Sequence, residues 1–181
     1  LPPLNKYADM VSFKTIEKSK AVEGERSILG IDVGSTTTKA VLLAEKDNRV
    51  TASCYLRTNG DPVGAAKECY KAIIGMAGVP VKVVGIGVTG SGRNVVGLHA
   101  MTDGVINEII AHATAAAFFD KEVDTIFEIG GQDAKYTYLT NGAASDYAMN
   151  EACSAGTGSF LEESAYESLG IDTKEIGDIA M

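Results

Sequence analysis

Near the start of the chain, hydrophobic and polar positions alternate in short runs that polar turns separate. Apolar residues dominate 28–33 and 39–44, and a third run covers 49–57 after a polar turn at 46–48. Strands of this length that follow one another through tight turns form antiparallel meanders. The pattern therefore predicts three consecutive antiparallel strands.

Two longer segments carry helical signals. Asp61 and Pro62 open the first, because Asp caps a helix N-terminus well and Pro suits the first turn. Its apolar positions continue to about 75–78 on one face. A second helix is expected over 107–119. Between them, the continuous apolar run 81–88 is typical of a buried parallel strand.

The strand pattern then begins again. The run 125–129 predicts another buried strand, and 134–140 predicts its hairpin partner. Asn141 and Gly142 form a strong turn signal, and one more short strand is expected near Tyr147. A helix is expected over 159–169, closed by a glycine.

A strand triplet with crossovers, begun a second time, indicates an α/β fold with an internal repeat. We interpret 27–120 as a first ribonuclease H-like subdomain and 121–181 as the truncated start of a second. Residues 1–26 lack clean periodicity and are interpreted as a linker from a preceding domain. A short docked helix is the alternative for this segment.

Composition narrows the classes of function. The 181 residues are 45% hydrophobic and 22% charged, which suits one good domain or two small ones. No apolar run reaches the roughly 18 residues of a membrane helix, and no signal peptide is visible. The formal net charge of −8, without a Lys/Arg cluster, argues against nucleic acid as a partner. Because the chain starts at Leu1, we expect it to be a piece of a longer protein.

The first predicted strand ends in a turn with the chemistry of a phosphate-binding loop. Gly34 lets the chain turn tightly, and Asp32 at the strand end is placed to hold Mg²⁺ directly or through water. Backbone amides beside hydroxyl groups suit a polyphosphate. The expected phosphate contacts are Gly34, Ser35, Thr36, Thr37, Thr38 and Lys39. The spacing is not that of a Walker loop, and an ordinary Gly-rich hairpin turn is the alternative.

A second loop of the same kind follows the strand 125–129. Gly130 and Gly131 allow the close approach of phosphate, while Gln132 and Asp133 are candidates to orient or activate a water molecule. Two such loops about a hundred residues apart, each after an apolar strand, indicate phosphate binding far more specifically than either loop alone.

The three cysteines show no CxxC spacing, which favours a reducing, cytoplasmic setting over disulfides. Cys54 and Cys69 occupy apolar positions and are expected in the core. Cys153 precedes a Gly-rich turn that opens a helix, where backbone amides lower a thiol pKa. An iron–sulfur cluster needs four ligands as a rule, so its other thiols would come from elsewhere. A small buried cysteine at a helix start is the alternative.

Several motifs occur in the order that one family shows. They are the first loop with its strand, 30–39; Gly90-Ser91-Gly92-Arg93; 108–113; the second loop, 129–135; and Cys153-Ser154-Ala155-Gly156-Thr157-Gly158. In these the chain resembles the ATP-dependent activators of 2-hydroxyacyl-CoA dehydratases and benzoyl-CoA reductases. One departure is Glu128, where the smaller activators usually have Asp.

The resemblance implies an actin-like ATPase fold and a homodimer that binds ATP and Mg²⁺. It also implies one [4Fe-4S] cluster at the dimer interface, with Cys153 as the first ligand from each subunit. The second cysteine and the adenosine pocket would lie beyond Met181. ATP hydrolysis would drive a low-potential electron into the dehydratase or reductase component. The truncated chain alone is expected to be inactive.

Two other readings share this fold. A sugar-kinase-like phosphotransferase could use Asp133 as its catalytic carboxylate, but the Cys153 motif would then have no purpose. A non-enzymatic, actin-like assembly module would bind nucleotide without turnover. Arg93 is expected either to touch phosphate or to cap its loop. Glu108 and His112, one helical turn apart, are expected to pack or hydrogen-bond near the nucleotide rather than bind a metal.

Overall fold

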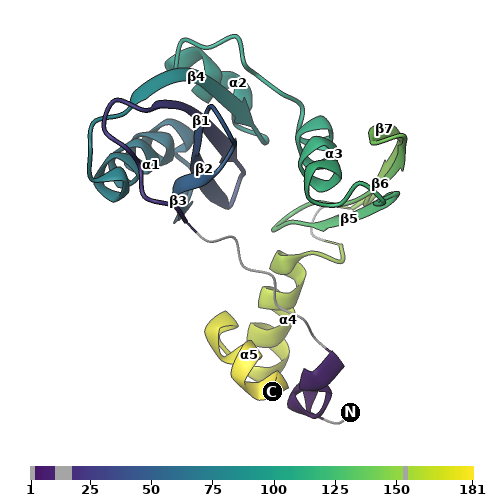
Figure 1. Ribbon diagram of the computed structural model, residues 1–181. Helices are drawn as coiled ribbons and strands as arrows, with labels where there is room; N and C mark the ends of the chain where they lie inside the picture. The colour runs from purple at the N-terminus through teal and green to yellow at the C-terminus, as the bar shows by residue number, and fades with distance from the viewer. Residues whose placement is uncertain (1–2, 11–17, 153–154) are drawn as a thin grey trace. The chain divides into compact units, whose positions relative to one another are not determined.

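The computed structural model describes residues 3–10, 18–152 and 155–181 (Figure 1). By its internal contacts the chain divides into two compact units. Among the described residues, one unit holds 18–124 and 139–145, and the other holds 3–10, 125–138, 146–152 and 155–181. A sheet of four strands belongs wholly to the first of these units.

This first sheet has the strand order β3-β2-β1-β4 (Figure 1). Its strands are β1 (Arg26–Val33), β2 (Thr37–Ala44), β3 (Val50–Arg57) and β4 (Lys82–Thr89). β2 pairs antiparallel with both β1 and β3, which confirms the predicted meander, and β4 runs parallel to β1. A parallel bridge from Val88 to Val105 adds one residue of a further strand beside β4.

Helix α1 (Pro62–Ala77) covers one face of the sheet and has the predicted caps. The Asp61 carboxylate accepts a hydrogen bond from the Gly64 amide, and Gly78 ends the helix with φ 67°. Alternate residues of β1 and β2 are buried, as a sheet with one covered face requires. The core of this unit consists of Leu29, Ile31, Val33, Ala40, Leu42, Ala52, Ala66, Cys69, Ile73, Val88 and Val96.

Two further helices follow β4. Helix α3 (Glu108–Phe119) has the predicted bounds, and the side chain of Asn107 caps it by accepting from the Ile109 amide. Helix α2 (Arg93–His99) was not predicted. It is short and contains Gly97, where a Cβ would lie 2.5 Å from the Val105 side chain. Close packing rather than helical periodicity therefore explains this glycine.

The second sheet is the hairpin succession β5-β6-β7. Its strands are β5 (Thr125–Ile129), β6 (Ala134–Thr140) and β7 (Ala143–Met149). Asn141 and Gly142 both have positive φ, 52° and 77°, as expected for the turn that joins β6 to β7. The predicted strand and turn positions are therefore confirmed.

The chain ends in two helices. Helix α4 (Gly158–Leu169) stops at Gly170 with φ 64°, as predicted. Helix α5 (Thr173–Ala180) was missed, although Asp172 and Glu175 form a capping box that was readable in the sequence. A 3-10 helix, η1 (Leu4–Met10), lies near the N-terminus. Within the described ranges, none of the helices combines the length and apolar character needed to cross a membrane.

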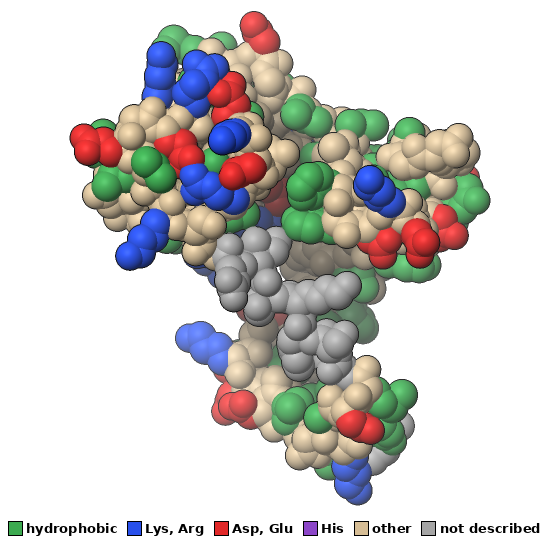
Figure 2. Space-filling view, viewed as in Figure 1, with side chains coloured by type: hydrophobic (Ala, Val, Ile, Leu, Met, Phe, Trp, Pro, Cys, Tyr) green, Lys and Arg blue, Asp and Glu red, His purple; other side chains and the backbone are tan. Residues whose placement is uncertain are grey.

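Part of the segment predicted as a linker is bonded to the first sheet. The Ser19 amide donates to the Val50 carbonyl, and the Lys82 amide donates to the Glu25 carbonyl. Arg49 forms an ion pair with Glu25. On the face shown in Figure 2, Lys and Arg side chains of this unit lie interspersed with Asp and Glu side chains.

Burial of the two apolar strands was predicted wrongly. In β4 only Val88 is buried, and in β5 the side chains of Phe127 and Ile129 are 76% and 68% exposed. β5 lies at an edge of its sheet, and β4 has a full strand on one side only. An apolar run becomes fully buried only where layers cover both faces, which the run itself cannot show.

Candidate functional site

The first Gly-rich loop is a tight turn between β1 and β2. The Gly34 amide donates to the Thr37 carbonyl at 2.9 Å, and a Cβ on Gly34 would lie 2.9 Å from that same oxygen. This close approach explains why the turn needs glycine. Ser35 at the tip is exposed, and Thr36 and Thr37 are partly exposed. Thr38 is fully buried.

Thr58, just after β3, braces this loop from beneath. Its amide donates to the Thr36 carbonyl at 2.9 Å, and its hydroxyl donates to the Gly34 carbonyl at 2.7 Å. Because that hydroxyl proton is used, the Thr38 hydroxyl 2.9 Å away must donate to Thr58. Thr58 was not among the residues predicted for the site. The available signal was its position directly after β3, because Arg57, the last residue of β3, pairs with Thr37 of the loop.

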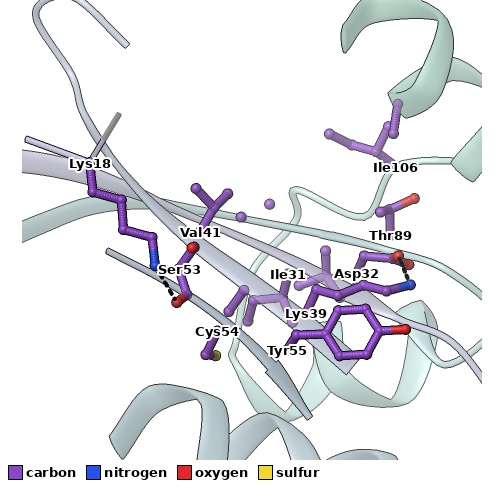
Figure 3. Close-up of a pocket in the computed structure, with 15 residues that line it drawn as sticks. Lys18, Ile31, Asp32, Lys39, Val41, Ser53, Cys54, Tyr55, Thr89 and Ile106 are labelled. Atoms are coloured by element: carbon purple, nitrogen blue, oxygen red, sulfur yellow. Dashed lines mark hydrogen bonds and ion pairs between the residues drawn. The ribbon is translucent and has the colours of Figure 1, made fainter. Parts of the chain in front are cut away.

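Asp32 and Lys39 face each other across β1 and β2 on the open side of the sheet (Figure 3). The Lys39 ammonium lies 2.9 Å from the Asp32 carboxylate and 5.6 Å from the centre of the Tyr55 ring. The two charged side chains are 40% and 32% exposed. They line a groove of about 670 Å³ together with Gly30, Gly87, Thr89 and Ile106.

The loop after β4 closes against the end of β1. Gly90 has φ 90°, and a Cβ there would lie 2.5 Å from the Val33 carbonyl oxygen and 2.6 Å from an Asp32 carboxylate oxygen. The Gly92 amide donates to that Val33 carbonyl at 2.9 Å. Arg93 donates to the Gly90 carbonyl at 3.0 Å, so it caps its own loop.

The second loop repeats this construction between β5 and β6. The Gly130 amide donates to the Asp133 carbonyl at 2.8 Å, as Gly34 does to Thr37. Glu128 pairs with Lys135 across the strands, as Asp32 pairs with Lys39, with 3.4 Å between carboxylate and ammonium. The internal repeat therefore extends to hydrogen bonds and charges. The Lys135 side chain is only 4% exposed, unlike that of Lys39.

The remaining second-loop residues differ in exposure. Gln132 is exposed, and Gly131 and Asp133 are partly exposed. The first amides of α4 dock on this loop: Gly158 donates to the Gly130 carbonyl and Ser159 to the Gly131 carbonyl, both at 2.9 Å. The loop and the start of α4 are therefore directly bonded. Cys153 lies outside the described residues.

The other two cysteines belong to the core of the first unit. Cys69 is fully buried and Cys54 packs beside it. Burial raises the pKa of the Cys69 thiol to about 12, and the Cys54 thiol next to it adds to the shift. A thiol that stays protonated near neutral pH is a poor metal ligand. Among the described residues, no group of three or more His, Cys, Asp or Glu side chains is arranged to hold a metal ion.

Comparison with known proteins adds the family context. The profile of the BadF/BadG/BcrA/BcrD ATPase family matches residues 29–181. The (R)-2-hydroxyglutaryl-CoA dehydratase activating ATPase of Acidaminococcus fermentans is 34% identical over 135 residues, 74% of this chain and 50% of that protein. The 2-hydroxyisocaproyl-CoA dehydratase activator of Clostridioides difficile is 35% identical over 156 residues, 84% and 56% of the two chains. The chain thus spans about half the length of these relatives.

Solved structures of such activators are similar to this chain as well. Component A of the Acidaminococcus fermentans (R)-2-hydroxyglutaryl-CoA dehydratase superposes with a TM-score of 0.73 at 30% identity, covering 84% of this chain and 57% of that one. The Clostridium difficile activator of 2-hydroxyisocaproyl-CoA dehydratase, with bound ADPNP, has the same TM-score at 32% identity, covering 84% and 56%. The fold of this chain is therefore the actin-like ATPase fold expected from the sequence.

Proposed function

Because the chain belongs to the BadF/BadG/BcrA/BcrD ATPase family, we propose that the whole protein hydrolyses ATP to activate an acyl-CoA dehydratase or reductase. The observation that carries this proposal is the repeated loop: two glycine turns with the same amide-to-carbonyl closure and the same acid–lysine pair. Similarity to two dehydratase activators, one of them with bound ADPNP, supports it. The subdomains 27–120 and 121–181 would each contribute one loop.

We propose that residues 34–38 of the first loop surround phosphate. Its oxygens would accept hydrogen bonds from the hydroxyl groups of Ser35, Thr36 and Thr37 and from loop amides other than that of Gly34, which donates to the Thr37 carbonyl. Lys39 would turn from the Asp32 carboxylate to phosphate. This exchange is feasible because the Lys39 side chain is 40% exposed and lies at the groove. Exposed ion pairs contribute only about 0–1 kcal/mol, so their loss costs little.

The residues around Asp32 suit Mg²⁺. Hard cations prefer carboxylate and hydroxyl oxygens. Thr89 pairs with Asp32 across β1 and β4, and within the described part of the chain its buried hydroxyl has no hydrogen-bond partner. Gly90 keeps the adjacent space free of a side chain. Bound there, Mg²⁺ would neutralise phosphate charge, and Asp32 would hold it directly or through water.

In the second loop, Gly130 and Gly131 would admit phosphate. Gln132 and Asp133 would orient the attacking water molecule, in keeping with the positioning role that such residues have in phosphoryl transfer. The exposed side chain of Gln132 and the partly exposed side chain of Asp133 are accessible to solvent for this task.

For the redox half, we propose that Cys153 binds a [4Fe-4S] cluster shared by two subunits. Cys69 does not fit, because it is fully buried and keeps its proton, and Cys54 is half-buried against the core beside it. Each subunit would therefore supply one thiolate from these 181 residues, and the remaining ligands would come from outside them. Such a cluster would supply the low-potential electron, and the protein would work in a reducing cytoplasm.

A matched pair of lysine variants tests the nucleotide half. Lys18 also lines the groove, where it donates to the Ser53 carbonyl (Figure 3). In the whole protein, Lys39→Met removes a charge-assisted bond to phosphate and is expected to weaken ADPNP binding roughly ten- to hundredfold, while Lys18→Met leaves it unchanged. Equal affinities of the two variants in a calorimetric titration would refute the assignment.

Anaerobic reconstitution with iron and sulfide tests the redox half: Cys153→Ser must abolish cluster binding.

A further inference from the structure

Asn150, the residue after β7, is bonded to the end of the second loop. Its main-chain N–H group donates to the Ala134 carbonyl at 3.0 Å. Its side-chain oxygen, Oδ1, accepts from the Ala134 amide at 3.1 Å. Since Oδ1 faces an N–H group, these bonds fix the orientation of the side-chain amide. The Nδ2 group must therefore point toward acceptors on its other side.

Three carbonyl oxygens surround that Nδ2 group. The Ala152 oxygen lies 2.6 Å away, and the oxygens of Gln132 and Ala155 each lie 3.4 Å away. Gln132 belongs to the second loop, whereas Ala152 and Ala155 flank the position of Cys153 in the sequence. One side chain thus joins the loop to both sides of the cysteine-bearing segment.

The same two segments are bonded a second time through their main chains. Gly130 and Gly131 accept from the first two amides of α4, Gly158 and Ser159. The second loop, 130–134, is therefore held to Ala152, Ala155 and the start of α4 by the Asn150 side chain and by these amides. A displacement of the second loop must carry these residues with it or break these bonds, and broken hydrogen bonds cost free energy.

From this geometry, we propose that Asn150 is a positioning residue that couples nucleotide binding at the second loop to Ala152, Ala155 and the start of α4. The inference rests on the proposed function, because it assumes that the second loop contacts phosphate. Coupling between two sites is a reciprocal free energy, typically a 5- to 150-fold effect on affinity. Asn150 supplies the link by which one arrangement of the loop favours one arrangement of the segment.

Asn150→Asp separates this role from simple bonding to β6. The variant keeps an acceptor for the Ala134 amide but loses the donor, and it places a carboxylate against the Ala152 oxygen. Asn141→Asp is the matched control: it makes the same change in the turn between β6 and β7, where φ is 52°. Aspartate tolerates that conformation as asparagine does.

The experiment is amide hydrogen exchange on the whole protein, with and without ADPNP. In the wild type and in Asn141→Asp, we expect ADPNP to slow exchange severalfold over 155–165. In Asn150→Asp, we expect ADPNP still to bind and to protect the first loop, while the change over 155–165 becomes clearly smaller, because only the Gly158 and Ser159 amides still join the second loop to α4. If Asn150→Asp does not fold, as judged by exchange over 134–149, Asn150→Ser is compared in the same way.

The outcomes separate the two ideas. If the wild type fails to bind ADPNP, the proposed nucleotide function is wrong. If the wild type binds ADPNP but the exchange of 155–165 does not respond, or if Asn150→Asp responds as the wild type does, the coupling role of Asn150 is overturned and nucleotide binding stands. A second readout is the absorption spectrum of the reconstituted cluster, which ADPNP should perturb less in Asn150→Asp than in Asn141→Asp.

Discussion

Thr58→Val is expected to destabilise the first loop without changing its sequence. Valine has nearly the shape of threonine, so the packing of this buried side chain, 4% exposed, is retained. What disappears is one hydroxyl that donates to the Gly34 carbonyl at 2.7 Å and accepts from the Thr38 hydroxyl at 2.9 Å. The variant therefore isolates the polar brace beneath the loop.

The magnitude follows from the two groups left behind. The Thr38 side chain is fully buried, so its unpaired hydroxyl carries the full desolvation cost of about 1–3 kcal/mol. Gly34 is only partly buried, and the loss at its carbonyl is nearer the net value of about 1 kcal/mol. We expect the free energy of unfolding to fall by about 2–4 kcal/mol. The affinity for ADPNP should fall severalfold, because the loop amides lose their fixed orientation.

The assay compares Thr58→Val with Thr51→Val in denaturant unfolding and in ADPNP titration. Thr51 is also buried in β3, but its hydroxyl makes one bond, to the Leu42 carbonyl, away from the loop. Its replacement should cost about 0.5–1.5 kcal/mol and leave the ADPNP affinity unchanged. Thr58→Ser, which keeps the hydroxyl, should bind ADPNP as the wild type does. If Thr58→Val matches Thr51→Val in both measurements, the bracing role is refuted.

Two further predictions concern the first unit. Gly90→Ala should lower the free energy of unfolding by more than about 2 kcal/mol, because its Cβ would clash with the Val33 carbonyl at a positive φ. Gly85→Ala should be nearly neutral, because nothing lies within 4 Å of its Cβ position. Equal melting temperatures of the two variants in thermal unfolding would contradict this prediction. The pKa of the Cys69 thiol is raised to about 12 in the folded state, whereas in the unfolded chain it is near 9. The free energy of unfolding should therefore be unaffected by this thiol below pH 9 and should fall as pH rises from 9 toward 12. Cys69→Ala, compared by denaturant unfolding across that range, should lose less stability with rising pH.

Local signals predicted the elements best. The caps of α1 lie in the sequence itself, since Asp61 and Gly78 act on the nearest turn, and the Asn141-Gly142 turn is set by two residues that tolerate positive φ. The glycine loops were visible because such tight turns, with a backbone oxygen close to where a Cβ would lie, demand unusual residue types. Helix α2 was missed because its Gly97 is required by close packing against Val105, a tertiary contact that the local sequence does not show.

The bracing and coupling residues were harder to find for the same reason. Thr58 and Asn150 are ordinary polar residues, and no periodicity or motif marks them. Thr58 reaches the loop only because β3 pairs with β2, and Asn150 reaches Gln132 only because β7 returns beside β6. Residues that touch ligand are constrained in type, whereas residues that hold a loop are defined by partners distant in sequence.

The two acid–lysine pairs show why this distinction matters. By residue type and spacing they are equivalent, since each joins a carboxylate two positions before a loop glycine to a lysine five positions after it. Lys39 is 40% exposed and can exchange Asp32 for another anion at little cost, whereas Lys135 is 4% exposed. Breaking a buried ion pair is costlier than breaking an exposed one, so Lys135 is less suited than Lys39 to leave its acid for a ligand. Of the two lysines, only Lys39 is exposed enough to contact a ligand readily, and solvent exposure, which the sequence does not record, separates the two.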